Sequence, residues 1–370
     1  SSIYLHALEQ FGGLRGLANY RWDAQSIFKN AAIQDLSAGG AVDIKAQICF
    51  NVFSSGLTDV KCTPYDIELL VVPHAFNAGN PTSQAGDGTV ALLTGEVQFS
   101  TSDASETLPE GALSISRSYL SYDAPQSFQP FGPGWVPSFS GTDVGASTLT
   151  VVDSTARQGF ISISNSNGDS LVYVVPTGVP SASPLGDYWA KDLDTANAKT
   201  LLRIYAANGF KHMQLFEADG QVTNWILYGT NSWQLESVVT ADGTTANRYE
   251  YDANHQLTRI IGPNRLGSTC NANAEEAGCK SLYVTYGNFP VGTSGQTVNR
   301  VAKIEYAAYD PATSAIKKVT VATYSYDSDG YLASVTDPRS ALTTSYSYTT
   351  HPLTQLKNIT RIATGTLAGT

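Results

Sequence analysis

"RYEYDANHQLTRI" (residues 248–260) and "TYSYDSDGYLASV" (residues 323–335) are two copies of one pattern. Each copy places two tyrosines two positions apart and follows the second with aspartate. A short polar turn and an apolar strand come next, which is typical of a β-hairpin. We therefore expect one hairpin to recur as a building unit. The residues that define it are Tyr249, Tyr251, Asp252 and Leu257 in the first copy, and Tyr324, Tyr326, Asp327, Gly330 and Leu332 in the second.

Partial copies of the hairpin extend the repeat. Tyr346 and Tyr348 form a third Tyr-x-Tyr. Its second tyrosine, Tyr348, lies 22 residues after Tyr326, the second tyrosine of the preceding copy. Repeats of roughly 20–25 residues are typical of stacked solenoids, in which each unit buries its apolar face against its neighbours. Both rings of a Tyr-x-Tyr lie on one face of a strand, so we expect a curved sheet with a concave face rich in tyrosine.

The composition indicates an all-β protein. Twenty tyrosines stand against one methionine, and only 15% of the residues are charged, which favours half-buried strands over packed helices. The net charge of −10 argues against a nucleic-acid partner, because binding phosphate needs clustered Lys and Arg. No apolar run is long enough for a membrane-spanning helix.

The distribution of Gly, Pro, Asn and Ser suggests two domains. We expect an N-terminal β-sandwich-like module at residues 1–76, a linker at residues 77–89 ("NAGNPTSQAGDGT") and a repeat-containing β-domain at residues 90–370. The sequence begins with serine rather than methionine, which we interpret as a processed chain or a piece of a longer one.

The four cysteines fall into two pairs by position. Cys49 and Cys62 are equidistant from a turn between Ser55 and Gly56, so a hairpin there would place the two thiols opposite each other. Cys270 and Cys279 close the polar loop "CNANAEEAGC". We predict two disulfides and an extracellular environment. Four free thiols are the alternative, and zinc is disfavoured because neither pair has Cys-x-x-Cys spacing.

The hairpins "YEYDANHQLTRIIGP" and "YSYDSDGYLASVTDP" resemble the YD repeat of bacterial RHS proteins, tripartite-toxin shell components and teneurins. Residues 92–139 resemble the segment that opens RHS domains, with a T-G-x-V strand, an L-x-I-x-R-x-Y strand and then F-G-x-G-W. The resemblance covers residues 90–362. It implies a spiral β-sheet that forms a partial shell.

By the same resemblance, we expect a non-enzymatic structural protein, secreted or on the cell surface. It would be part of a shell, scaffold or surface-contact device used in toxin encapsulation or adhesion. Its partner would be a protein: its own C-terminal extension, another copy, or a cell-surface molecule. The family's self-cleaving aspartyl signature and toxin segment are not found in residues 1–370, and only four to six repeats can be counted.

No residues carry an evident catalytic pattern. The five histidines stand singly, the Asp-Gly sequences are typical of tight turns rather than calcium loops, and neighbouring acidic residues face apart on a strand. We therefore expect no catalytic residues, no metal and no cofactor. The alternative function is an extracellular protein that binds or cleaves carbohydrate.

"PFGPGWVP" (residues 130–137) cannot be a regular strand, because it holds three prolines and two glycines. One interpretation is an aromatic platform for a ligand such as a sugar. We favour a structural turn whose large aromatic residues anchor the first strand layer. The residues of this turn are Phe131, Gly132, Gly134 and Trp135.

The last expectation concerns assembly. A few repeats cannot close a cage, so the spiral should leave a sheet edge open near the C-terminus. The N-terminal module of a neighbouring copy is one candidate to cap this edge and build a filament. A frayed edge of a truncated chain is the alternative.

Overall fold

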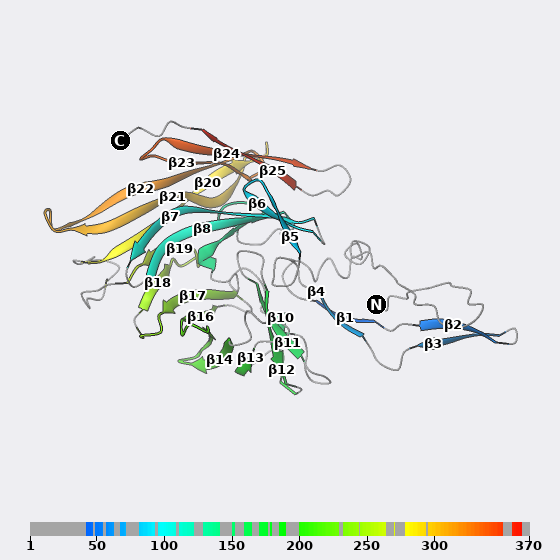
Figure 1. Cartoon of the computed structure of the whole chain (residues 1–370). Coiled ribbons are helices and arrows are strands. Elements are labelled where there is room, and N and C mark those ends of the chain that lie inside the picture. Colours follow the sequence, from blue (N-terminus) through cyan, green and yellow to red (C-terminus); the bar gives the residue numbers. More distant parts are fainter. Residues whose placement is uncertain are drawn as a thin grey trace. The chain divides into compact units, whose positions relative to one another are not determined.

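The computed structural model divides the chain into two compact units, Ser1–Pro73 and His74–Thr370. Most of the described residues are in strands (Figure 1), and a 3-10 turn, η1 (Ser138–Ser140), is the one helical element among them. The predicted all-β fold is confirmed. None of the described helices is long and apolar enough to cross a membrane. The described residues are 42–46, 49–54, 57–62, 67–71, 81–92, 95–108, 111–121, 129–140, 150–151, 159–164, 170–176, 178–179, 185–189, 200–228, 232–243, 245–263, 270, 278–293, 295–350 and 357–364.

The first unit contains two antiparallel strand pairs. β1 (Val42–Ala46) pairs with β4 (Ile67–Val71), and β2 (Cys49–Ser54) pairs with β3 (Leu57–Cys62). The backbone register places Cys49 opposite Cys62, as the position of the turn predicts. The disulfide between these residues and the sandwich-like arrangement of the module stay predictions.

The second unit begins with a five-stranded antiparallel sheet in sequence order. The strands are β5 (Thr82–Ala85), β6 (Gly88–Ala91), β7 (Val97–Leu108), β8 (Gly111–Leu120) and β9 (Trp135–Pro137). The linker prediction for residues 77–89 is therefore wrong from residue 82 onward. Gly86, with φ of 62°, allows the tight two-residue turn between β5 and β6, so a glycine-rich stretch forms a hairpin. The division between the units falls after Pro73.

A thirteen-stranded antiparallel sheet follows, and every strand lies beside the strand that precedes it in the sequence. This meander is what successive hairpins produce. Its strands are β13 (Gly186–Trp189), β14 (Leu201–Ala207), β15 (Phe210–Phe216), β16 (Val222–Tyr228), β17 (Ser232–Val239), β18 (Thr245–Tyr251), β19 (Leu257–Ile261), β20 (Lys280–Val291), β21 (Gln296–Asp310), β22 (Ala315–Tyr326), β23 (Leu332–Asp337), β24 (Leu342–Thr350) and β25 (Lys357–Thr364).

The two copies of the repeat hairpin have the same turn. The Asp252 carboxylate accepts hydrogen bonds from the backbone N–H groups of Asn254 and Gln256, at 2.9 and 2.8 Å. Asp327 accepts the two equivalent bonds at 3.0 and 2.8 Å. Aspartate favours such turns because its short side chain can bond the backbone two residues on. The left-handed position of the turn is occupied by His255 and Gly330, with φ of 61° and 80°.

The main core lies between the five-stranded sheet and the second half of the large sheet. β8 contacts β18 and β20, and β7 contacts β22. Repeat tyrosines pack against this core from β18, β20, β22 and β24. The tyrosine-rich face that the repeat predicts is therefore present, but the strands of the opening segment cover it. Figure 1 shows β7 and β8 in cyan alongside the strands of the large sheet.

A second core lies against the first strands of the large sheet. β10 (Thr150–Val151), β11 (Gly159–Ser164) and β12 (Ser170–Val175) form a three-stranded antiparallel sheet. Apolar side chains of β11 and β12 pack with residues of β13–β17, and Trp225 lies fully buried among them. The small sheet thus buries the apolar face at the start of the meander.

The predicted bridge between Cys270 and Cys279 is present, with a Cα–Cα distance of 5.8 Å. Both cysteines are buried with Ile261 in a small separate cluster. Arg248 Nη2 donates a hydrogen bond to the Cys270 carbonyl at 2.6 Å. The disulfide therefore anchors the loop between β19 and β20 to the large sheet.

Candidate functional site

An aspartate and an arginine pair in the interior between the two large sheets. Asp103 lies at a bulge in β7 between Ser102 and Ala104, and Arg117 lies on β8. Arg117 Nε and Nη2 donate to the two carboxylate oxygens of Asp103, at 2.8 and 3.1 Å. The Arg117 and Asp103 side chains are only 1% and 3% exposed. Paired N–H···O contacts of this kind are among the strongest hydrogen bonds in proteins.

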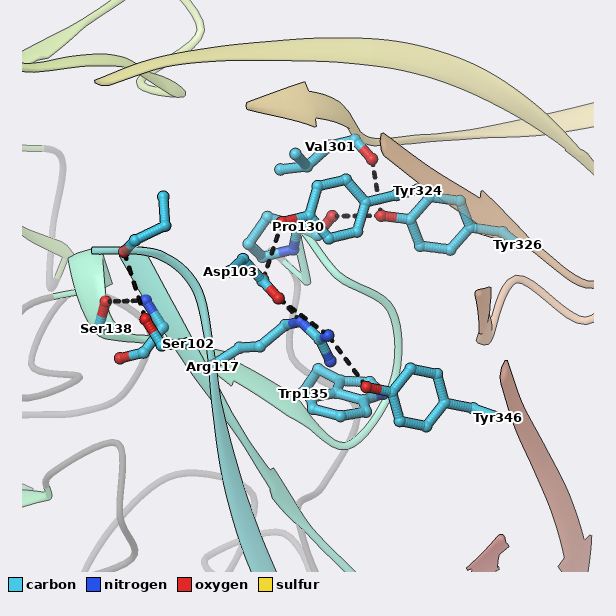
Figure 2. Close-up of polar contacts among 12 residues, drawn as sticks. Ser102, Asp103, Arg117, Pro130, Trp135, Ser138, Val301, Tyr324, Tyr326 and Tyr346 are labelled. Carbon is cyan, nitrogen blue, oxygen red and sulfur yellow. Dashed lines mark hydrogen bonds and ion pairs between the residues drawn. The ribbon is translucent and has the colours of Figure 1, made fainter. Parts of the chain in front are cut away.

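Two repeat tyrosines complete the polar network (Figure 2). The Tyr324 hydroxyl of β22 donates to Asp103 at 2.8 Å, and Arg117 Nη2 donates to the Tyr346 hydroxyl of β24 at 3.1 Å. Each of these tyrosines is the first ring of a Tyr-x-Tyr. The ion pair of the opening segment is therefore bonded directly to two repeat units more than 200 residues away.

The protonation states of the network follow from burial and charge. Burial raises the pKa of Tyr324 well above its usual value, and the Asp103 carboxylate raises it further. Burial by itself would lower the pKa of Arg117, but the charge and hydrogen bonds of Asp103 act together with the nearby Tyr346 and Tyr324, and the pKa is raised overall. At neutral pH Tyr324 is therefore a neutral hydrogen-bond donor, and Arg117 is a cation.

Aromatic rings surround the guanidinium group. Arg117 Cζ lies 4.2 Å from the centre of the Trp135 ring and 5.3 Å from that of Tyr346. The Trp135 and Tyr346 rings meet edge to face, with their centres 5.1 Å apart. A cation over an aromatic face is attracted by the ring, and more strongly where water is excluded. The rings thus stabilise a charge that burial would otherwise penalise.

The turn predicted from "PFGPGWVP" joins the opening segment to the repeats. Phe131 and Trp135 are 0% and 1% exposed, as the structural interpretation expects and an open aromatic platform does not. The Trp135 indole donates to the Tyr348 hydroxyl at 2.9 Å. The Val301 N–H donates to the Pro130 carbonyl at 2.8 Å, so the turn also bonds the backbone of β21.

Both glycines of this turn are required by their surroundings. Gly132 and Gly134 have φ of 89° and 79°, in the left-handed region that favours glycine. A Cβ on Gly132 would lie 2.8 Å from the carbonyl oxygen of Gly330, in the turn of the second repeat copy. A Cβ on Gly134 would lie 2.6 Å from the Tyr119 ring. The turn therefore approaches the repeat more closely than any side chain permits.

The second tyrosine of each Tyr-x-Tyr bonds to the backbone rather than to the ion pair, and it does so in the same way in each copy. Its hydroxyl donates across the hairpin sheet to a backbone carbonyl of the preceding strand. The bonds are Tyr251 to Leu235 at 2.9 Å, Tyr326 to Val301 at 2.8 Å, and Tyr348 to Leu332 at 2.9 Å. Because a backbone carbonyl is the acceptor, the bond does not depend on the side chain of that residue.

A groove of about 660 Å³ lies beside the ion pair. Its lining includes Asp103 and Arg117, together with residues of β21–β24 such as Tyr346. Volumes of this size are typical of ligand-binding clefts. The groove is therefore the candidate binding site of the second unit.

The predicted residues are distributed over four places. Phe131, Gly132, Gly134, Trp135, Tyr324, Tyr326, Gly330, Leu332, Tyr346 and Tyr348 lie around or next to the ion pair. Tyr249, Tyr251, Asp252 and Leu257 form the corresponding hairpin further back in the same sheet. Cys270 and Cys279 lie in their own cluster, and Cys49 and Cys62 belong to the first unit.

The ion pair itself was missed in the sequence analysis, although β8 carries a signal for it. In "LSISRSY" (residues 113–119) the inward positions are Leu113, Ile115, Arg117 and Tyr119, and all four are buried. An arginine in the apolar phase of a strand needs an interior partner of opposite charge. The sequence does not indicate which acidic residue fills that role, because the bulge at Asp103 alters the alternation of β7.

The network is suited to stabilising the contact between the opening segment and the repeats through hydrogen bonds. The Asp103 carboxylate already accepts two bonds from Arg117 and one from Tyr324. Among the described residues, no group of three or more His, Cys, Asp or Glu side chains could hold a metal ion. Nothing in this geometry assigns a catalytic role to a residue.

Comparisons with known proteins show no matching family and a distant likeness to solved structures. No family model matches the chain, and no curated protein sequence matches it. The solved structure of the N-terminal domain of effector protein SpvB from Salmonella typhimurium strain LT2 is similar at 12% sequence identity. The match covers 71% of this chain and 97% of that chain, with a TM-score of 0.35. A likeness of this degree supports no inference about function.

Proposed function

We propose that the chain is a non-enzymatic structural protein of the RHS type, secreted or on the cell surface. It forms part of a shell, scaffold or surface-contact device of the kind used for toxin encapsulation or adhesion. The observation that carries this proposal is the recurrence of the same tyrosine contacts in successive hairpins. Three hydroxyls bond the backbone of the preceding strand in the same way.

These contacts favour a rigid sheet rather than a mobile one. A buried tyrosine hydroxyl that loses its acceptor costs about 1–3 kcal/mol, so each hydroxyl fixes one hairpin against its predecessor. The opening segment then locks two of the repeats through Asp103 and Arg117. Repeat proteins built from such neighbour contacts are suited to presenting large rigid surfaces.

The partner is a protein in this proposal. Its candidates are the chain's own C-terminal extension, a second copy, and a cell-surface molecule. Among the described strands, β25 has β24 as its single neighbour, and Ile362 on it is 58% exposed. Unpaired backbone groups on such an edge favour pairing with another strand. The disulfide between Cys270 and Cys279 supports an oxidising, extracellular location.

The alternative function is an extracellular protein that binds or cleaves carbohydrate. The observation in its favour is the groove, which is lined by the carboxylates of Asp103, Glu106 and Asp337. Each of these carboxylates is already paired with a cation: Arg117, Lys280 and Arg339 respectively. A glycosidase needs two carboxyl groups free to act on either side of a sugar, so the structural role is the better supported.

A glycan array and an assay for released reducing sugar separate the two functions. The purified full chain is compared with Glu106→Ala and Asp337→Ala variants, which remove exposed carboxylates from the groove. The structural proposal expects neither glycan binding nor turnover by any of the proteins. Binding or turnover that both alanine variants abolish would support the carbohydrate function and contradict the proposal.

A further inference from the structure

Among the described strands, one side of β7 has almost no partner. β6 pairs with it only at Val97 and Gln98, whereas β8 follows its other side as far as Leu108. No other described strand pairs with β7. In an antiparallel strand, every second residue directs both its N–H and its C=O to the same side. From Thr101 onward, this side of β7 therefore has no partner strand among the described residues, although the Ala104 carbonyl already accepts a bond from the Ser102 hydroxyl at 3.3 Å.

The groove includes the part of β7 that has no second partner strand. Six consecutive residues of β7, from Thr101 to Glu106, line it. The rest of the lining includes the aliphatic side chains of Val319, Val335 and Leu342 beside polar and aromatic ones. Val319 and Leu342 are 42% and 38% exposed although they are large apolar residues on strands. The groove thus combines a backbone edge with exposed apolar side chains.

The charged side chains of the groove neutralise one another, so they do not favour a charged ligand. Asp103 pairs with Arg117 at 2.8 Å, Glu106 with Lys280 at 3.0 Å and Asp337 with Arg339 at 2.9 Å. A neutral ligand, such as an uncharged peptide segment, therefore suits this lining better than a charged one, which would compete with these ion pairs.

We propose that the groove binds an extended polypeptide segment of a partner protein, which adds as a strand to the free side of β7. The backbone edge supplies the main-chain bonds, and alternate aliphatic side chains of the segment pack on Val319, Val335 and Leu342. The six residues of β7 correspond to about 20 Å of strand, so the bound segment is short. This inference goes beyond the structural role and does not depend on the RHS resemblance.

The bulge at Asp103 favours a short segment over a second copy's sheet. Bulges and inward-pointing charges twist and interrupt an edge, which opposes continuous pairing between two sheets. A single flexible segment can follow such an irregular edge. The groove therefore excludes sheet-to-sheet association while it accepts one strand.

The test begins with hydrogen exchange on the full chain. Amides of residues 101–106 on the free side should exchange rapidly in the unbound protein. Linear peptides of about nine residues are then selected from a phage-displayed random library on the immobilised chain. We expect selected sequences with alternating aliphatic residues, and we expect a synthetic copy of one to slow exchange at residues 101–106. Full protection of these amides in the unbound chain would overturn the proposal.

Groove variants make the test specific. Leu342→Trp and Val319→Trp fill the aliphatic part of the groove from exposed positions, and Ile362→Trp places the same ring on β25, outside the groove. Circular dichroism verifies that each variant is folded. The two groove variants should weaken peptide binding by about tenfold or more, and the control should stay within about twofold. Equal binding by all four proteins, no enrichment of any peptide, or binding without protection of β7 would overturn the proposal.

Discussion

Replacement of Asp103 by alanine should destabilise the second unit far more than an average substitution. It leaves Arg117 charged and buried, at 1% exposure, and removes the acceptor of the Tyr324 hydroxyl. Breaking one partner of a buried ion pair typically costs about 3–5 kcal/mol. The orphaned hydroxyl acts in the same direction. We therefore expect the free energy of unfolding to fall by at least about 3 kcal/mol.

A double variant tests the reason for this loss. Asp103→Leu combined with Arg117→Met replaces the ion pair by apolar side chains, and such replacements are often nearly neutral. The double variant should therefore be more stable than Asp103→Ala alone. The measurement is urea unfolding of the full chain with pulsed hydrogen exchange, read on peptides from β8. This readout follows the second unit separately from the first.

The exposed pair of Asp187 and Arg203 is a matched control. It has the same two-bond geometry between neighbouring strands, with both contacts at 2.8 Å. Its side chains are 46% and 43% exposed, so water screens the charges and replaces lost bonds. Asp187→Ala should hardly move the urea midpoint. Equal losses for Asp103→Ala and Asp187→Ala would refute the idea that the buried pair anchors the sheets.

Three further predictions follow from the same contacts. Burial raises the pKa of Tyr324, so the contribution of Tyr324 to the free energy of unfolding is intact below about pH 10 and decreases above that pH by about 1.4 kcal/mol per pH unit. Tyrosinate absorbance should therefore rise together with unfolding. Titration of Tyr324 while the chain stays folded would contradict this prediction. Gly132→Ala should lower the melting temperature more than Gly243→Ala. Both glycines have positive φ, but of the two only Gly132 lies where a Cβ would meet a backbone oxygen within 4 Å. Equal decreases in melting temperature would show that the close approach is unimportant. Replacing Cys270 and Cys279 by alanine should lower stability by about 2–3 kcal/mol, measured by urea unfolding, and an unchanged midpoint would contradict the anchoring role of the loop.

The parts of the fold that local sequence determines could be predicted. The Asp252 and Asp327 turns have a side-chain cap and a left-handed position that the sequence shows directly. The register of Cys49 against Cys62 follows from the position of one turn. These features depend on residues within a few positions of each other, where few alternative arrangements exist.

The parts that depend on distant packing could not be predicted. The bond from Arg117 to Tyr346 spans 229 residues, and many pairings of sheets are compatible with the same strand pattern. The β5–β6 hairpin was interpreted as linker because its glycines are equally typical of loops. The groove arises because β6 leaves most of β7 unpaired, and strand length alone does not reveal where a neighbouring strand ends.

The central claim that copies of this chain pair at the free edge of β25 to build a larger wall is tested most directly by the mass of the chain in solution. The measurement is multi-angle light scattering of the purified full chain over about 1–100 μM, because association depends on concentration. The account predicts a mass that rises above the 39.4 kDa of one chain, as strands pair at the free edge of β25. A mass of 39.4 kDa at every concentration would contradict it.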